Sequence, residues 1–129
     1  MAGHSDTIAN VYAAFARGDI PAVLAVLAPN ASWTEAEGFP YAGTYVGPDA
    51  VLRNVFMKIG AEWDGFTAIS HELIANADTV VSLGEYSGTY KATGKSFRAP
   101  FVHVWKFGGD SVIAFRQHTD TAVVQRALQ

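Results

Sequence analysis

The sequence predicts an α+β fold, in which helices pack on one face of a curved antiparallel sheet. Apolar residues recur with a helical period in the first half of the chain, and they alternate with polar residues after Gly65. The links between the later segments are short and rich in turn-forming residues, which favours antiparallel neighbours. A curved sheet with helices across its concave side leaves a conical space, and such a space is a natural ligand pocket.

Three helices are expected in the first half of the chain. The first ends near Gly18, and the second begins after Asp19, a good N-cap residue, and is stopped by Pro29. The third begins at Pro48, and its region ends at Gly65. The apolar faces of the first and third helices consist of Ile8, Val11, Tyr12 and Phe15, and of Val51, Leu52, Val55, Phe56 and Ile59.

Five strands are expected. A short one, ASWTEA (31–36), places Trp33 and Glu35 on one face, and a loop rich in Gly, Pro and aromatic residues follows at 37–47. The final segment, TAVVQRALQ, is expected to form a turn of helix or a tail. The four longer strands are FTAISHELIA (66–75), DTVVSLGEYSGTY (78–90), SFRAPFVHVWKF (96–107) and SVIAFRQHT (111–119).

Composition limits the classes of function. A length of 129 residues suits one domain over 1–129, and a 50% hydrophobic content allows a real core. The net charge of −3, without a basic cluster, argues against a nucleic-acid partner. The absence of cysteine excludes disulfides and thiolate metal sites. No secretory signal and no apolar run of about 20 residues is visible, so we expect a cytoplasmic protein without a membrane partner.

The last predicted hairpin concentrates the candidate chemistry. If Gly109 and Asp110 form its turn, His103 lies opposite Arg116, and one face of the hairpin combines aromatic rings with ionisable groups. A partly polar pocket accommodates such a face, because a dry core does not tolerate these groups unpaired. The opposite, aliphatic face is expected to pack on another subunit. The pocket face would comprise Phe101, His103, Trp105, Phe107, Ala114, Arg116, His118 and Asp120.

Three segments carry a resemblance to a known superfamily. They are YAAFARGDIPAVLAVLAPNASWTE (12–35), GPDAVLRNVF (47–56) and APFVHVWKFGGDSVIAFRQHTDT (99–121). Together with the element order, they resemble the nuclear-transport-factor-2-like superfamily, and within it the SnoaL-like and ketosteroid-isomerase-related group. The resemblance covers nearly the whole chain. It implies a cone-shaped fold, with three helices on a curved mixed, mostly antiparallel β-sheet, and commonly a homodimer formed through the sheet.

The resemblance also implies roles for particular residues. Related polyketide cyclases use an Asp on the last strand as general acid/base, assisted by a His on the preceding strand, and Asp120 and His103 match these positions. Tyr12 matches the first-helix Tyr of ketosteroid isomerases, whose carboxyl donor has no match here. Limonene epoxide hydrolases need an Asp–Arg–Asp set; Arg116 and Asp120 match two members, and Glu35 would have to supply the second carboxylate.

We therefore expect a cofactor-independent enzyme that removes a proton next to a carbonyl of a hydrophobic, oxygenated small molecule. Aldol cyclisation or isomerisation would follow. The candidate catalytic residues are Asp120, His103, His118, Arg116 and Tyr12. The candidate substrate-binding residues are Trp33, Glu35, Tyr45, Phe56, Trp63, Phe101 and Trp105.

Structural interpretations stay open beside these roles. Asp120 would pair with Arg116 or cap the final segment, and His103 would be a satisfied core histidine. The alternative function is a non-catalytic small-molecule-binding or dimerisation module of the same fold. No metal is expected, because His103 and His118 lack a recognised ligand spacing and Arg116 would repel a cation. No cofactor is expected either, since no Gly-rich phosphate loop precedes a helix.

Overall fold

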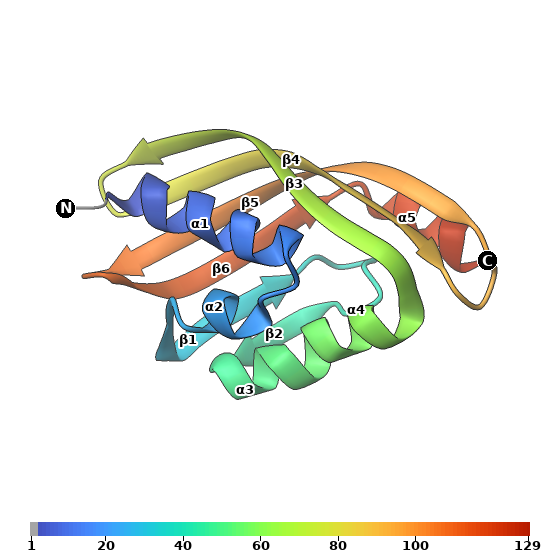
Figure 1. Ribbon diagram of the computed structural model, residues 1–129, viewed down its shortest axis with the longest axis horizontal. Coiled ribbons are helices and arrows are strands. Elements are labelled where there is room, and N and C mark those ends of the chain that lie inside the picture. The colour runs from blue at the N-terminus through green and yellow to red at the C-terminus, as the bar shows by residue number, and fades with distance from the viewer. Residues whose placement is uncertain (1–2) are drawn as a thin grey trace.

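The computed structural model of the protein describes residues 3–129; Met1 and Ala2, where the predicted domain begins, lie outside the described residues. Helices lie across one face of a six-stranded, strongly curved sheet (Figure 1). The predicted α+β fold, with a mixed and mostly antiparallel sheet, is confirmed. Among residues 3–129, no helix is long and apolar enough to cross a bilayer.

The three predicted helices are present, and the final segment of the chain adds a further one. The third predicted helix is a continuous stretch from Pro48 to Glu62, whose middle turn is π-helical. The final segment, left open between a helix and a tail, forms a helix of eight residues. The helices are α1 (His4–Ala16), α2 (Ile20–Leu24), α3 (Pro48–Val51), η1 (Leu52–Phe56), α4 (Met57–Glu62) and α5 (Thr121–Leu128).

The six strands form one sheet in the order β2-β1-β6-β5-β4-β3. Within residues 3–129, only the β1–β6 pair is parallel, and the other four pairs are antiparallel. The parallel pair joins the first half of the chain to the hairpins of the second half. The strands are β1 (Leu27–Glu35), β2 (Gly43–Val46), β3 (Trp63–Asn76), β4 (Thr79–Tyr90), β5 (Ser96–Gly108) and β6 (Ser111–Thr119).

Two predicted boundaries near the N-terminal end of the sheet are wrong. Asp19 caps α2 as expected, by accepting a hydrogen bond from the Ala22 amide at 3.2 Å, but the helix ends at Leu24. Pro29, expected to stop that helix, instead lies inside β1. The β1–β6 pairing is irregular between Leu27 and Ser32, so the missing amide hydrogen of proline interrupts no regular ladder there. The predicted loop at 37–47 also contains the short strand β2.

The predicted register of the last hairpin is wrong by one residue. Phe107 pairs with Val112 as expected, but Lys106 then pairs with Ala114, so Ile113 is an extra residue in β6. Such a bulge moves every following side chain to the other face of the sheet. As a result His103 pairs with Gln117 instead of Arg116.

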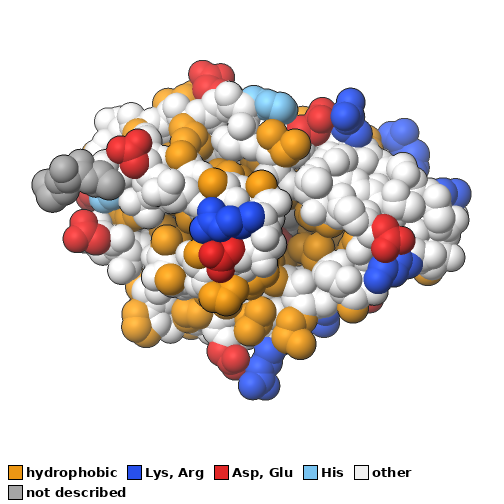
Figure 2. Space-filling view, viewed as in Figure 1, with side chains coloured by type: hydrophobic (Ala, Val, Ile, Leu, Met, Phe, Trp, Pro, Cys, Tyr) orange, Lys and Arg blue, Asp and Glu red, His pale blue; other side chains and the backbone are white. Residues whose placement is uncertain are grey.

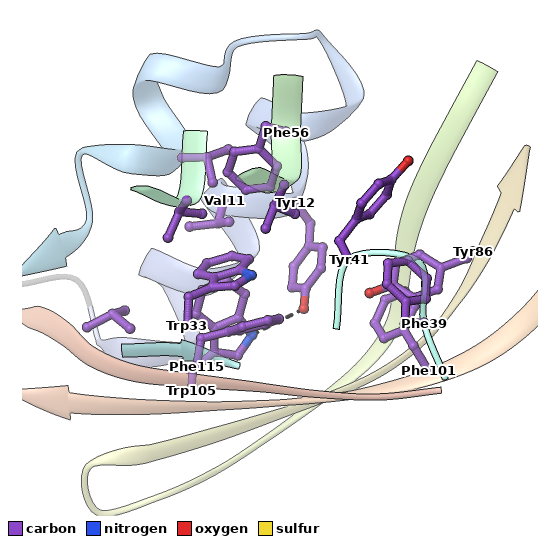
Figure 3. Packing of buried hydrophobic residues seen from close by; sticks show 14 of the residues in the cluster. Val11, Tyr12, Trp33, Phe39, Tyr41, Phe56, Tyr86, Phe101, Trp105 and Phe115 are labelled. Carbon is purple, nitrogen blue, oxygen red and sulfur yellow. Dashed lines mark hydrogen bonds between the residues drawn. The ribbon is translucent and has the colours of Figure 1, made fainter. Parts of the chain in front are cut away.

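Aromatic rings fill most of the space between the sheet and the helices. Trp33 stacks on Phe115 with their centroids 3.8 Å apart, and Trp105 meets Phe115 at 4.6 Å. Figure 3 shows this group beside Tyr12, with Phe39 and Phe101 close to Tyr86 further along the sheet. The concave face of the sheet therefore carries the core, and the space left between the rings is where a site can lie.

Candidate functional site

A cavity of about 370 Å³ lies between the helices and the concave face of the sheet. This volume falls in the range of small-molecule sites. Of the seven predicted substrate-binding residues, five line it: Trp33, Glu35, Phe56, Trp63 and Trp105. Further walls come from Phe15, Ile20, Phe39, Val55, Ile59, Gly60, Gly65, Phe66, Ala68, Tyr86, His103, Phe115 and Gln117.

Two predicted substrate-binding residues lie outside this lining. Phe101 is buried behind it, stacked on the His103 ring with centroids 3.9 Å apart. Tyr45 lies in β2, and its hydroxyl donates a hydrogen bond to the Tyr41 carbonyl at 2.8 Å. Both residues therefore contact groups next to the cavity without lining it. Phe101 packs on the His103 ring, and Tyr45 binds the segment that follows β1.

Glu35 is the only acidic side chain in the cavity wall, among the residues that the structure describes. It ends β1, where the alternation of the strand turns Ala31, Trp33 and Glu35 inward, as the sequence predicts for the last two. Its side chain is 5% exposed, and burial raises the pKa of Glu35 to about 8, against a smaller opposing effect of the Trp33 indole. At neutral pH the group is thus mostly protonated, yet it ionises within a physiological range.

The indole of Trp33 adds an unused donor beside this carboxyl. Its Nε1 atom is buried and has no hydrogen-bond partner of normal geometry within residues 3–129. A buried donor without a partner is uncommon in folded proteins. The indole is close enough to Glu35 to favour the ionised carboxylate, so a ligand oxygen near both groups would meet a donor and an acid/base.

His103 lies at the centre of a buried hydrogen-bond network. Its Nδ1 atom is 2.6 Å from the Tyr12 hydroxyl, and its Nε2 atom is 2.5 Å from the Tyr86 hydroxyl. The Trp105 indole donates to the Tyr12 hydroxyl at 3.2 Å. Burial, with a smaller contribution from His118, lowers the pKa of His103 well below its ordinary value, so the imidazole is neutral.

Gln117 fixes the cavity-facing end of this network. Its Oε1 atom accepts a hydrogen bond from the Ala36 amide at 2.9 Å, which determines the orientation of the side-chain amide. Its Nε2 atom then donates to the Tyr86 hydroxyl at 2.9 Å. Burial, together with the charge of Glu35, raises the pKa of Tyr86. Glu35 and the Tyr86 hydroxyl therefore interact electrostatically across one cavity.

The bulge at Ile113 removes three predicted catalytic residues from the cavity. Arg116 and His118 are exposed on the convex face of the sheet, because the shifted register reverses the facing of β6. Asp120 is exposed at the N-cap of α5, where its carboxylate accepts a hydrogen bond from the Val123 amide at 3.3 Å. The predicted inward orientation of these three side chains is wrong, and the alternative of Asp120 as a cap is confirmed.

The shifted register of β6 also separates the residues that the sequence placed together as a possible metal site or epoxide hydrolase site. His103 and His118 lie on opposite faces of the sheet, and no three His, Asp or Glu side chains gather into a metal-binding group within residues 3–129. The two carboxylates of the epoxide hydrolase pattern do not meet either, since Glu35 faces the cavity while Asp120 is exposed. The charged side chains are scattered over the surface shown in Figure 2 and form no patch of one sign there.

Sequence reasoning missed two polar residues of the site, Tyr86 and Gln117. The inward facing of Tyr86 could have been predicted from the two-residue period of a strand. Tyr86 lies on the same face of β4 as Val80 and Ser82, and all three are more buried than their neighbours. Gln117 had none, since its inward orientation depends on the bulge in β6. The site thus combines Glu35 with a neutral tyrosine–histidine–tyrosine network, in place of the predicted cluster near the C-terminus.

Comparison with known proteins identifies the family. The family model described as the SnoaL-like domain matches residues 8–115. The chain belongs to the SnoaL-like domain family. An NTF2-like protein from Burkholderia thailandensis is 45% identical, covers 100% of this chain and 99% of its own, and superposes with a TM-score of 0.97. No match is found among curated proteins.

Two other solved structures show the spread of this SnoaL-like fold. An NTF2-like protein of unknown function from Burkholderia pseudomallei is 32% identical, with a TM-score of 0.91 and coverage of 100% of this chain and 99% of that one. TerC, co-crystallised with polyporic acid, is 23% identical, with a TM-score of 0.86 and 96% coverage of both chains. At this identity, the likeness to TerC shows the fold alone.

Proposed function

We propose that the protein is a cofactor-independent acid/base enzyme that acts on a hydrophobic, oxygenated ring compound. The observation that carries this proposal is the carboxyl of Glu35, which lies in the wall of an aromatic cavity with its pKa raised to about 8. A group of this pKa can both take up and release a proton near neutral pH, which is the requirement for general acid/base catalysis.

The polar groups of the cavity divide naturally between two roles. Glu35, as carboxylate, removes a proton from a carbon next to a ligand carbonyl. The Tyr86 hydroxyl, held by Gln117 and His103, donates a hydrogen bond to the oxygen that gains negative charge. Protonated Glu35 then returns the proton to another atom, giving an isomerised or cyclised product. This assignment transfers the predicted role of Asp120 to Glu35 and keeps His103 and Tyr12 as support for the donor.

The walls of the cavity favour a largely apolar ligand of modest size. Most lining residues are aromatic or aliphatic, and the polar groups are few and convergent. The polyporic acid bound to TerC is consistent with a ligand of this class in a related fold. No lysine or arginine lines the cavity within the described residues, so a neutral ring with carbonyl or hydroxyl groups suits it better than a strongly anionic ligand.

The test uses 2-tetralone, a bicyclic ketone whose C1 protons are acidic, as a probe. Proton NMR follows exchange of these protons with deuterium oxide in the presence of protein. The wild type is expected to accelerate exchange above the buffer rate, and Glu35→Gln to lower the protein-dependent rate by about 100-fold or more, the usual contribution of a general base. Asp120→Asn is the matched control and is expected to retain the wild-type rate.

Two results would refute this proposal. Undiminished exchange with Glu35→Gln would show that Glu35 is not the base. A wild-type rate equal to that of the buffer, together with saturable binding of the probe, would instead support the alternative of a non-catalytic binding module.

We also propose that two copies of the chain associate through the convex face of the sheet. Ile69, Ile74 and Ile113 of this face are about half exposed, at 54%, 49% and 46%. Exposed apolar groups on the uncovered side of a sheet favour association. Light scattering after gel filtration is expected to give a dimer for the wild type and a monomer for Val104→Glu, on this face, but a dimer for Met57→Glu on α4. A monomeric wild type would contradict this proposal.

A further inference from the structure

A second opening in the surface lies on the other side of the buried histidine. This groove runs between α1 and β3 and is lined by Ala9, Tyr12, Ser70, His71, Glu72 and Leu73. Tyr12 thus contributes to the wall of the groove and also contacts His103, whose other ring nitrogen contacts the cavity-lining Tyr86. The cavity and the groove are therefore joined by polar side chains through the aromatic core.

The outer part of this connection consists of two serines. Ser82 lies opposite His103 in the β4–β5 ladder and is fully buried. Its hydroxyl is close enough to the Tyr12 hydroxyl to lower the pKa of that group, and it donates a hydrogen bond to the Ser70 hydroxyl at 2.8 Å. Ser70 is half-buried and lines the groove, beside an irregularity in the β3–β4 pairing between Ser70 and Glu72. A series of neighbouring hydroxyl and imidazole groups thus extends from the core to the groove.

Counting hydrogens shows that the inner part of this series has two equivalent states. A neutral imidazole has one N–H, so it donates to one of its two tyrosines and accepts from the other. When Tyr12 donates to His103, the imidazole donates to Tyr86, whose own hydroxyl hydrogen is free for a cavity ligand. When Tyr86 donates to His103, the imidazole donates to Tyr12, whose hydroxyl hydrogen is free for Ser82. The donors Trp105 and Gln117 satisfy the same tyrosine oxygens in both states.

We propose that these groups form a proton relay between the buried cavity and the groove beside α1. From cavity to groove, its members are Tyr86, His103, Tyr12, Ser82 and Ser70.

One proton passes along this relay without leaving charge on any member. The Tyr86 oxygen accepts a proton from a ligand while its own hydrogen moves to His103 Nε2. The Nδ1 hydrogen of His103 moves to Tyr12, whose hydrogen passes to Ser82. Ser82 then passes its own hydrogen to Ser70, which releases one to water in the groove. Each transfer breaks one O–H or N–H bond and forms another, and the imidazole ends as the opposite neutral tautomer.

The relay has a consequence for the enzyme, and that consequence rests on the proposed function. A bound ligand excludes water from the cavity, and the relay lets Tyr86 change from acceptor to donor during a reaction. The relay is reset when a proton returns along it, which suits isomerisation or cyclisation without net release of a proton. The relay itself can be measured without any substrate, so its failure is distinguishable from failure of the proposed function.

The test measures exchange of the His103 ring N–H with water, by NMR of protein labelled with ¹⁵N-histidine. The signal is assigned by its loss in His103→Asn. Ser82→Ala breaks the relay beyond Tyr12 without touching the cavity wall, and we expect it to slow exchange at least fivefold. The matched control is Ser87→Ala, which removes a similar hydroxyl pair between β4 and β3, Ser87 with Thr67, outside the relay. It is expected to leave the rate unchanged.

A second variant keeps the proposal testable if Ser82→Ala fails to fold. Ser70→Ala breaks the next link at a half-buried position and is expected to slow exchange as well. An unchanged rate in Ser82→Ala, with native circular dichroism, overturns the relay. An unchanged rate in Ser70→Ala alone, with slowed exchange in Ser82→Ala, overturns the exit through Ser70 to the groove.

Discussion

Replacement of Glu35 by glutamine is expected to change how stability depends on pH. In the folded protein burial raises the pKa of Glu35 to about 8, from an ordinary value of 4.5. The folded state therefore holds this proton more tightly than the unfolded state. The stabilisation is complete below pH 4.5 and is lost as the pH rises through 8. Between pH 5 and pH 9 this single group is expected to cost the wild type roughly 4 kcal/mol, an upper value since the cavity admits water.

Urea unfolding followed by circular dichroism at pH 5 and pH 9 measures this effect. Glu35→Gln should lose less stability than the wild type over the same interval, because glutamine does not titrate. Glu37→Gln, at an exposed position two residues further along the chain, is the matched control and should behave like the wild type. Equal losses in the wild type and Glu35→Gln would refute a buried, proton-holding carboxyl.

Three further substitutions test the cavity donor, the cap of α5 and the packing of the sheet separately. Tyr86→Phe removes the cavity donor while keeping the ring, and it should slow 2-tetralone exchange by about 100-fold or more, the typical effect of one lost oxyanion donor; an unchanged rate would exclude that role. Asp120→Ala removes the N-cap of α5 and should cost about 1 kcal/mol in unfolding free energy without slowing exchange. Gly84→Ala would press a methyl group into the Ile69 carbonyl and the Phe101 ring, and should destabilise by roughly 2 kcal/mol, whereas Gly60→Ala, in open space on α4, should not.

The fold was readable from the sequence because it depends on periodicity and turn chemistry. The alternation that turned Trp33 and Glu35 inward needed only the period of a strand, and the structure confirms it. The helical stripe from Val51 to Ile59 and the turn at Gly109 also depend on neighbours along the chain. The π turn from Leu52 to Phe56 does not follow from periodicity alone, and it was not predicted.

The site could be predicted only in part, because one extra residue determines which side chains of β6 face the cavity. The extra residue Ile113 lies beside Gly108, where a side chain would collide with it, and no simple pattern in the sequence marks the bulge. The error reversed the facing of Arg116 and His118 but left His103, on the other strand of the hairpin, where it was expected. The predicted inward facing of Trp33 and Glu35 on β1 and of His103 on β5 is therefore confirmed, and the reversal of facing was confined to the last strand.

The most direct measurement is a ¹³C NMR titration of the Glu35 side-chain carboxyl, assigned by comparison with Glu35→Gln. If this group is the proton-exchanging acid of an apolar cavity, its resonance will move with a midpoint near pH 8, and binding of 2-tetralone will shift that midpoint. A midpoint near 4.5, unaffected by the ketone, would mean that the carboxyl is solvated and would contradict the central claim.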